Sequence, residues 1–264
     1  MELGISTACL YPMKTEEALD TLIDQGFRYF EIFLNSPSEL KEDYLGMLSR
    51  MLRENGCRVK SIHPFSSGFE SFLLFSGYER RFEDGMQFYD RYYAAAERLG
   101  AEILVLHGDK HFTHPDLTEE EYFERFAELA RRGRRFGVTL AQENVNLYRS
   151  ADAAFLARMS DYLGDEAHYV LDIKQAVRAG QNPLAICEAM GSHVAHVHVN
   201  DHLPSSDCLL PGKGQMHFEE LLALLKRFGY RGGYVIEVYR KSFSQLSELR
   251  ASYHHMKNIL TSAL

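Results

Sequence analysis

The sequence has no tryptophan, seven prolines and four cysteines. The cysteines are Cys9, Cys57, Cys187 and Cys208, and no two of them have CxxC spacing. This spacing argues against a zinc ribbon and against a thioredoxin-type redox motif. We therefore expect reduced, buried thiols of the kind found in cytosolic proteins.

Positive charge and long apolar segments are also scarce. The formal net charge is −8, and non-specific nucleic-acid binding depends on Lys and Arg to neutralise phosphates, so we expect no nucleic-acid partner. No apolar run approaches the roughly 18 residues of a membrane span. The N-terminal MELGISTACLYPM has neither the basic start nor the long apolar core of a signal peptide. We expect a cytoplasmic protein without a membrane partner.

Short apolar segments alternate with longer amphipathic segments along the 264 residues, of which 45% are hydrophobic. Strands are expected at 2–7, 28–34, 57–63, 101–107, 138–143, 168–172, 193–199 and 232–239. Helices are expected at 14–27, 36–56, 79–100, 118–137, 149–163, 174–180, 183–191, 217–229 and 244–262. Thr118 and Glu121 form the pattern of a capping box, and Gly26 stands where a helix should end.

Eight strands separated by crossover helices predict a parallel sheet, and at this length a closed one. The predicted fold is therefore an α/β protein, a (β/α)8 TIM barrel forming one domain over residues 1–264. An open doubly wound sheet is the alternative, but no GxGxxG turn follows the first strand. The long connection at 64–78 is expected to be a lid or binding loop, with four phenylalanines that cover a ligand or pack on the barrel rim.

Four consecutive expected strands, the fifth to the eighth, end near side chains that bind metals. These side chains are Glu143, Asp172, His198 and Glu237. The strands of such a barrel end at one face and lie about 4.8 Å apart, so the four side chains can meet. A buried acid needs a partner, and one divalent cation can satisfy several acids. We therefore predict one bound Mn²⁺, Mg²⁺, Co²⁺ or Zn²⁺; acids paired with lysine or arginine in place of metal would contradict this.

A second set of polar side chains is expected at the ends of strands two, three and four. Glu31, His63 and His107 occupy these positions. They can contact a substrate, transfer protons, or have a purely structural role. His63 and His107 can also bind a second ion together with Glu143.

Other polar residues lie beside the predicted metal ligands. His196 precedes His198 by two residues and so shares its face one layer deeper, where it can contact substrate or support that ring. Lys174 and Gln175 follow Asp172 and are candidate substrate contacts. Cations that could hold a substrate phosphate are Lys110, Arg149, Lys174, Lys213 and Arg240.

The ordered segments QEN, LDIKQA, HVHVND, PGKGQMHFEEL and VIEVY resemble the xylose isomerase-like TIM-barrel family of sugar and sugar-phosphate isomerases and epimerases. The resemblance covers nearly the whole chain. It implies that the four strand-end residues bind one divalent ion, and that Glu143 and Glu237 exchange protons with a small sugar or sugar phosphate. It also implies a homodimer or homotetramer. One departure is Gln175, which stands where the family often has histidine.

The hypothesis that follows is a metal-dependent ketose isomerase or epimerase. The cation would stabilise an enediolate while one of Glu143 and Glu237 removes a proton and the other returns it. Three alternatives remain open: a sugar or inosose dehydratase on the same metal, an endonuclease IV-like DNA-repair enzyme, and a non-catalytic sugar-binding barrel. The acidic chain disfavours the DNA-repair reading, and Gln175 removes a ligand of that enzyme's third metal.

Overall fold

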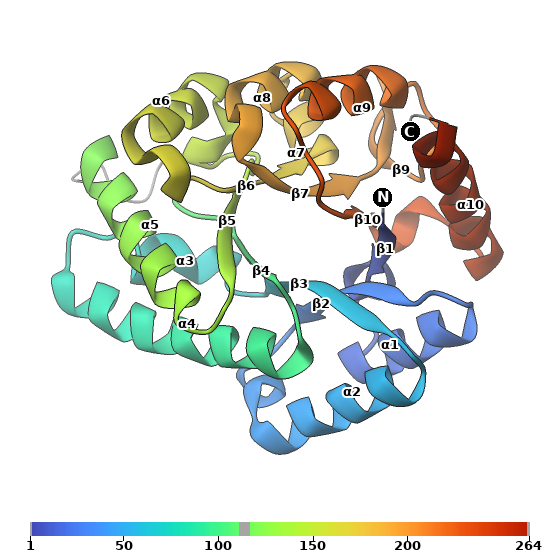
Figure 1. Cartoon of the computed structure of the whole chain (residues 1–264), viewed down its shortest axis with the longest axis horizontal. Coiled ribbons are helices and arrows are strands. Elements are labelled where there is room, and N and C mark those ends of the chain that lie inside the picture. The colour runs from blue at the N-terminus through green and yellow to red at the C-terminus, as the bar shows by residue number, and fades with distance from the viewer. Residues whose placement is uncertain (1, 111–116, 263–264) are drawn as a thin grey trace.

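The computed structural model describes residues 2–110 and 117–262. Eight parallel strands close into a barrel in the order β1-β10-β7-β6-β5-β4-β3-β2, and helices surround them (Figure 1). The barrel strands are β1 (Leu3–Ser6), β2 (Tyr29–Leu34), β3 (Arg58–Pro64), β4 (Ile103–Leu106), β5 (Thr139–Glu143), β6 (Tyr169–Asp172), β7 (Val194–Val199) and β10 (Tyr234–Ile236). The predicted (β/α)8 barrel is confirmed, because each predicted strand segment contains or overlaps one of these strands.

Ten helices lie in the described part of the chain, and most of them bury apolar side chains. They are α1 (Thr15–Asp24), α2 (Glu42–Glu54), α3 (Ser67–Leu73), α4 (Glu79–Leu99), α5 (Glu119–Arg134), α6 (Ala153–Leu163), α7 (Ile173–Arg178), α8 (Pro183–Met190), α9 (Phe218–Arg227) and α10 (Leu246–Ser262). The predicted capping box is present: Glu121 N donates to Thr118 Oγ1, and Thr118 N donates to Glu121 Oε2. Gly26, which follows the C-cap residue Gln25 of α1, has a φ of +91°, as expected for the end of a helix.

Two connections contain structure that the sequence did not indicate. The segment 64–78, predicted to be a lid or binding loop, contains α3. Phe75 from that segment is fully buried and stacks on Tyr122 with ring centroids 4.2 Å apart, so it belongs to the core. The segment 201–215 forms a hairpin of β8 (Asp201–Leu203) and β9 (Ser206–Leu209).

Two helices begin later than predicted. The segment 36–56 starts as a short 3-10 helix at Pro37–Leu40, and α2 follows after Lys41, whose extended backbone interrupts the helix. The segment 149–163 also starts as a 3-10 turn, and α6 begins only after Asp152. The Asp152 side chain accepts a hydrogen bond from the backbone of α6, which makes it the N-cap.

The register of neighbouring strands places their inward-facing side chains at the same height along the barrel axis. Asp172 on β6 lies opposite His198 on β7, and Val235 on β10 lies opposite the same histidine. Because successive residues of a strand face opposite sides, Glu237 then faces inward like Val235. The carboxyl ends of neighbouring strands therefore present their polar side chains at one height of the barrel.

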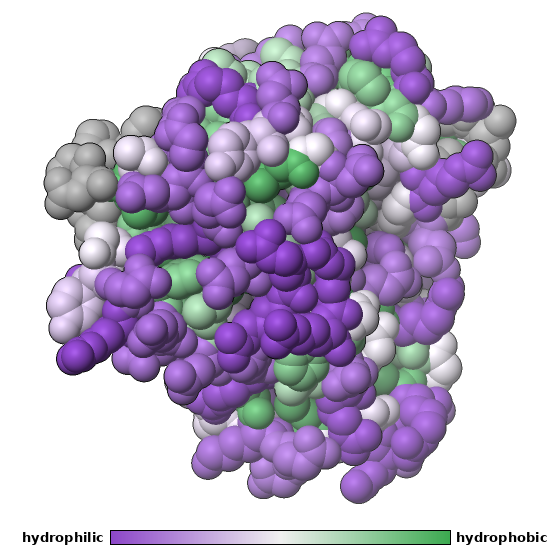
Figure 2. Space-filling view, turned by 60° about the vertical axis from the view of Figure 1, so that its left-hand side comes forward, coloured by the Kyte–Doolittle hydropathy of each residue, from purple (hydrophilic) through white to green (hydrophobic). Residues whose placement is uncertain are grey.

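The face of the molecule shown in Figure 2 is mostly hydrophilic, with apolar residues in small scattered patches. All four cysteines are free thiols, but Cys57 is partly exposed and not buried as expected. Within residues 2–110 and 117–262, no helix combines the length and apolar character that crossing a bilayer requires.

Candidate metal and substrate site

The four predicted metal ligands meet at the carboxyl end of the barrel. His198 Nδ1 lies 3.2 Å from Glu143 Oε1, 3.2 Å from Glu237 Oε2 and 3.5 Å from Asp172 Oδ2. One donor atom from each of the four lies within 4.8 Å of the others, and all four side chains are buried. The geometry thus brings together two glutamates, an aspartate and an imidazole, as the sequence predicted.

Lys174, in the first turn of α7, reaches the same place. Its ammonium forms ion pairs with Asp172 Oδ2 and Glu237 Oε2. Burial alone would lower the pKa of Lys174, but the two carboxylates raise it well above its usual value. Pairing of the acids with lysine in place of a metal would contradict the predicted metal site. Two of the four proposed ligands, Asp172 and Glu237, have such a pairing.

The charge balance of the cluster shows whether the residues still fit a metal ion. Four buried carboxylates meet here, from Glu31, Glu143, Asp172 and Glu237, and the positive groups beside them are the Lys174 ammonium and the His198 imidazole. Burial raises the pKa of Glu143 to about 7, and its Oε2 has no hydrogen-bond partner within the described part of the chain. Buried acids need compensation, so the donor set fits a further, divalent cation with oxygen and imidazole ligands.

Asp172 is held by amides through its backbone and through one carboxylate oxygen, Oδ1. Its backbone N–H donates to Asn144 Oδ1 at 2.7 Å, and its carbonyl accepts from Asn144 Nδ2 at 2.9 Å. Asp172 Oδ1 accepts hydrogen bonds from Asn200 Nδ2 and from the backbone N–H of Gln175, each at 3.2 Å. The other oxygen, Oδ2, faces His198 and Lys174.

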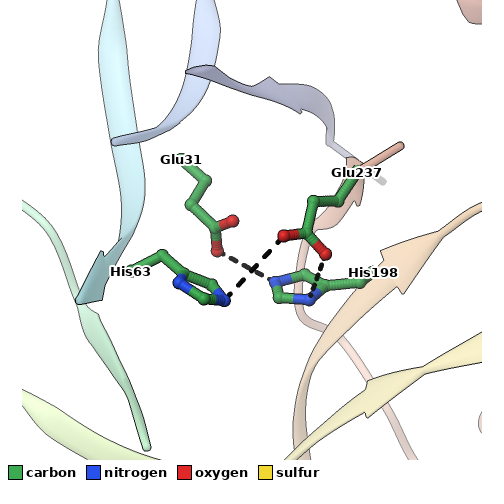
Figure 3. A group of neighbouring side chains, drawn as sticks. All are labelled: Glu31, His63, His198 and Glu237. Carbon is green, nitrogen blue, oxygen red and sulfur yellow. Dashed lines mark hydrogen bonds and ion pairs between the residues drawn. The ribbon is translucent and has the colours of Figure 1, made fainter. Parts of the chain in front are cut away.

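Glu31 lies within β2 and not at its end as predicted. It is fully buried, and its Oε2 lies 2.9 Å from His198 Nε2 (Figure 3). The same oxygen accepts a hydrogen bond from Ser61 Oγ. Burial opposes charging of His198, but the carboxylates of Glu31 and Glu237 raise its pKa well above the usual value. Glu31 therefore orients the imidazole from behind, and it does not line the cavity.

His196 lies one layer below His198, as the strand period predicted. Its Nε2 is 3.2 Å from Ser61 Oγ and 3.6 Å from Glu31 Oε2. The side chain is fully buried and is not part of the cavity wall. His196 therefore lies where it can stabilise the position of the Glu31 carboxylate that contacts His198.

His63 and His107 both line the cavity and contact each other edge to face, with ring centroids 4.8 Å apart and ring planes at 70°. His63 Nε2 lies 3.8 Å from Glu237 Oε1, and His107 Nε2 lies 3.8 Å from Glu143 Oε2. Burial and the neighbouring His107 lower the pKa of His63 to about 4, so this ring is neutral at pH 7. The donor atoms of His63, His107 and Glu143 also lie within 4.8 Å of one another.

Glu70 on α3 is a functional candidate that the sequence did not indicate. Its carboxylate accepts hydrogen bonds from the backbone N–H groups of His107 (2.8 Å) and Gly108 (2.7 Å), and its Oε1 lies 3.0 Å from His107 Nδ1. Burial opposes charging of Glu70, yet His107 lowers its pKa below the usual value. The available signal was one acid in the otherwise apolar and small-residue segment 64–78.

A cavity of about 610 Å³ opens above these side chains. Its polar wall consists of Asn35, His63, Ser67, His107, Glu143, Lys174, Gln175 and Glu237. Its apolar and aromatic wall consists of Ala8, Tyr11, Pro12, Phe33, Pro64, Phe65, Val238 and Tyr239. Of the five cations considered for phosphate binding, Lys174 lines this cavity, whereas Arg149 pairs with Asp109 at 3.0 Å outside it.

Comparison with known proteins identifies relatives over most of the chain. The profile of the family described as xylose isomerase-like TIM barrel matches residues 19–259. An uncharacterized protein of Mycobacterium tuberculosis is 27% identical over 274 aligned positions, which cover 94% of this chain and 92% of that protein.

Among solved structures, a D-tagatose 3-epimerase-like protein aligns with a TM-score of 0.80 at 20% identity, covering 100% of this chain and 98% of that one. An L-ribulose 3-epimerase aligns with a TM-score of 0.76 at 18% identity, covering 100% and 96%. At these identities the structural likeness establishes the barrel fold.

Proposed function

The chain belongs to the xylose isomerase-like TIM-barrel family, and we propose that it is a divalent-metal-dependent isomerase or epimerase of a ketose. One observation carries this proposal. Two glutamates, an aspartate and an imidazole from four consecutive strands converge at the floor of one cavity. Converging oxygen and imidazole donors of this kind suit Mn²⁺, Mg²⁺, Co²⁺ or Zn²⁺.

Glu143, Asp172, His198 and Glu237 would hold the ion. When bound, the ion would supply the positive charge that makes a proton next to a ketose carbonyl easier to remove. Glu143 and Glu237 are the two of these four that line the cavity, so they are the groups that can take a proton from the substrate and return it. Return to the opposite face of the same carbon gives an epimer, and return to the neighbouring carbon gives an aldose.

The remaining polar wall suits a substrate with several hydroxyl groups. His63, His107 and Gln175 line the cavity and offer hydrogen-bonding groups. Solved relatives with the same fold carry sugar 3-epimerase names, which supports a sugar as the substrate class. Alternatively, His63 and His107 could bind a second ion together with Glu143. The number of metal ions bound per chain distinguishes this role from contact with the substrate.

The proposal predicts that the protein exchanges the α-proton of a ketose with solvent when Mn²⁺ is added. A panel of free and phosphorylated ketoses in deuterated water, followed by NMR, would show deuterium at the α-carbon together with an epimer or an aldose. Glu237→Gln should reduce this exchange about a thousandfold or more, since proton transfer by a placed side chain contributes about 10²–10⁴-fold and Glu237 is also a proposed ligand. Near wild-type exchange in this variant would exclude the role.

A matched control is Glu219→Gln, on the exposed side of α9. It should leave exchange unchanged. Circular dichroism and the melting temperature of both variants establish that the barrel persists. Absence of exchange for every ketose in the wild-type protein, despite bound metal, would contradict the proposed chemistry.

A further inference from the structure

The proposed metal site contains a cation supplied by the chain itself. Lys174 is 3% exposed, and its ammonium contacts Asp172 and Glu237 within the cavity that would hold the substrate. No other lysine or arginine lines this cavity among the described residues. Within the described part of the chain, the Lys174 ammonium is therefore the lysine or arginine charge that lies against the proposed metal ligands in this cavity.

The oxygens that Lys174 contacts are those that a metal ion would need. Asp172 Oδ2 and Glu237 Oε2 pair with the ammonium and also lie 3.5 and 3.2 Å from His198 Nδ1. Asp172 Oδ1 already accepts hydrogen bonds from Asn200 and from the Gln175 backbone. An ion shared by these ligands must take the oxygens now on Lys174, and two cations at the same oxygens repel each other.

We propose that Lys174 and the divalent ion are alternative partners of Asp172 and Glu237. The ammonium neutralises these acids in the metal-free protein, and it leaves them when the ion binds. This inference rests on the proposed function, since it assumes that an ion binds to this cluster. It makes Lys174 a residue that sets the metal affinity, in addition to its predicted contact with substrate.

The cavity offers a place for the displaced ammonium. Lys174 Nζ lies 5.9 Å from the ring centroid of Tyr239, which forms part of the cavity wall. The four-carbon stem of lysine is flexible, and an aromatic ring face attracts a cation at about this distance. After displacement the ammonium would stay inside the cavity, where it can meet an oxygen of the bound sugar.

Lys174→Met tests the proposal, because it keeps much of the side-chain volume and removes the charge. The wild type and the variant are titrated with Mn²⁺ by calorimetry after treatment with a chelator. We expect Lys174→Met to bind Mn²⁺ at least tenfold more tightly, and its metal-free form to melt at a lower temperature because two buried acids lose their partner. Equal or weaker Mn²⁺ binding would overturn the proposal, because Lys174 would then be neutral or helpful to the ion.

Three further variants separate the possible outcomes. Lys174→Arg keeps the positive charge and should show no gain in Mn²⁺ affinity. A tenfold gain in this variant would overturn the proposal, so it provides a test even if Lys174→Met fails to fold. Lys257→Met removes an exposed lysine of α10 and should leave the affinity unchanged. Asp172→Asn should abolish Mn²⁺ binding with or without Lys174→Met. Absence of metal binding in both the wild type and Lys174→Met would instead refute the proposed function and this inference with it.

Discussion

The side chains of the site differ in how far the sequence could locate them. Glu143, Asp172 and His198 were predictable, because a strand alternates its faces and parallel strands end at one side of a barrel. Glu31 was placed one layer too high, since a mid-strand acid and a strand-end acid look alike in a six-residue apolar segment. The contacts of Lys174 were not predictable, because they depend on the direction in which α7 leaves β6.

Glu70 illustrates a side chain that acts through another. With Oε1 near His107 Nδ1 and Oε2 on two backbone N–H groups, it fixes the ring so that Nε2 faces the cavity. In Glu70→Gln an amide N–H₂ replaces one of these acceptors and faces donors. We expect ketose turnover or affinity to fall by about 10–100-fold, as for other groups that orient site histidines. Because buried donors are left unsatisfied, the free energy of unfolding of Glu70→Gln should fall by about 1–3 kcal/mol.

The measurement for Glu70→Gln combines steady-state kinetics with ¹⁵N NMR of histidine. In the wild type, the His107 signals should be those of a ring with one fixed protonated nitrogen, and in Glu70→Gln they should shift away from that pattern. If Glu70 had only a structural role, Glu70→Gln would lower the melting temperature and leave these signals unchanged. Glu83→Gln, on an exposed position of α4, is the control and should change neither. Unchanged kinetics and unchanged His107 signals would exclude Glu70 as a positioning residue.

At the scale of elements, periodicity located all eight barrel strands, because β-branched and apolar segments alternate with amphipathic ones. It missed α3 because the segment 64–78 is rich in Ser and Gly, which indicate a loop when no tertiary contact is known. The hairpin β8–β9 was missed for the same reason: Pro and Ser dominate its turn.

The segment after this hairpin is held by one buried carboxylate. Asp201 accepts hydrogen bonds from the backbone N–H groups of His202, Gly212, Gly214 and Met216, at 2.8–3.0 Å. A side chain at Gly214 would clash with it, since a Cβ there would lie 2.4 Å from Asp201 Oδ1. The carboxylate thus fixes the PGKGQM turn against the hairpin, and the hairpin packs beside α7.

Asp201→Ala should therefore release this turn while the barrel remains folded. Each lost hydrogen bond contributes about 0.5–1.5 kcal/mol, so the turn should open locally, and trypsin should cleave after the exposed Lys213 at least tenfold faster. Mass spectrometry of the digest locates the cut. Asp84→Ala, an exposed position on α4, should digest like the wild type. Wild-type cleavage rates in Asp201→Ala would show that other contacts hold the turn.

At the scale of the whole molecule, closure of the barrel is what makes a site from side chains that lie far apart in the sequence. Glu31 and His198 are separated by 167 residues, yet their side chains are 2.9 Å apart. The alternation of strands and helices predicted closure, because eight such units fit the chain length. The substrate and the number of subunits depend on the shape of the cavity and of the outer surface, which periodicity does not encode.

The central claim is that Glu143, Asp172, His198 and Glu237 hold one divalent ion. The most direct measurement is anomalous X-ray scattering from a crystal of the wild-type protein soaked with Mn²⁺. The account predicts one strong peak per chain at about 2.0–2.3 Å from an atom of each of the four side chains, with the Lys174 ammonium moved off Asp172 and Glu237. No peak there, with Lys174 still on both acids at saturating Mn²⁺, would contradict it.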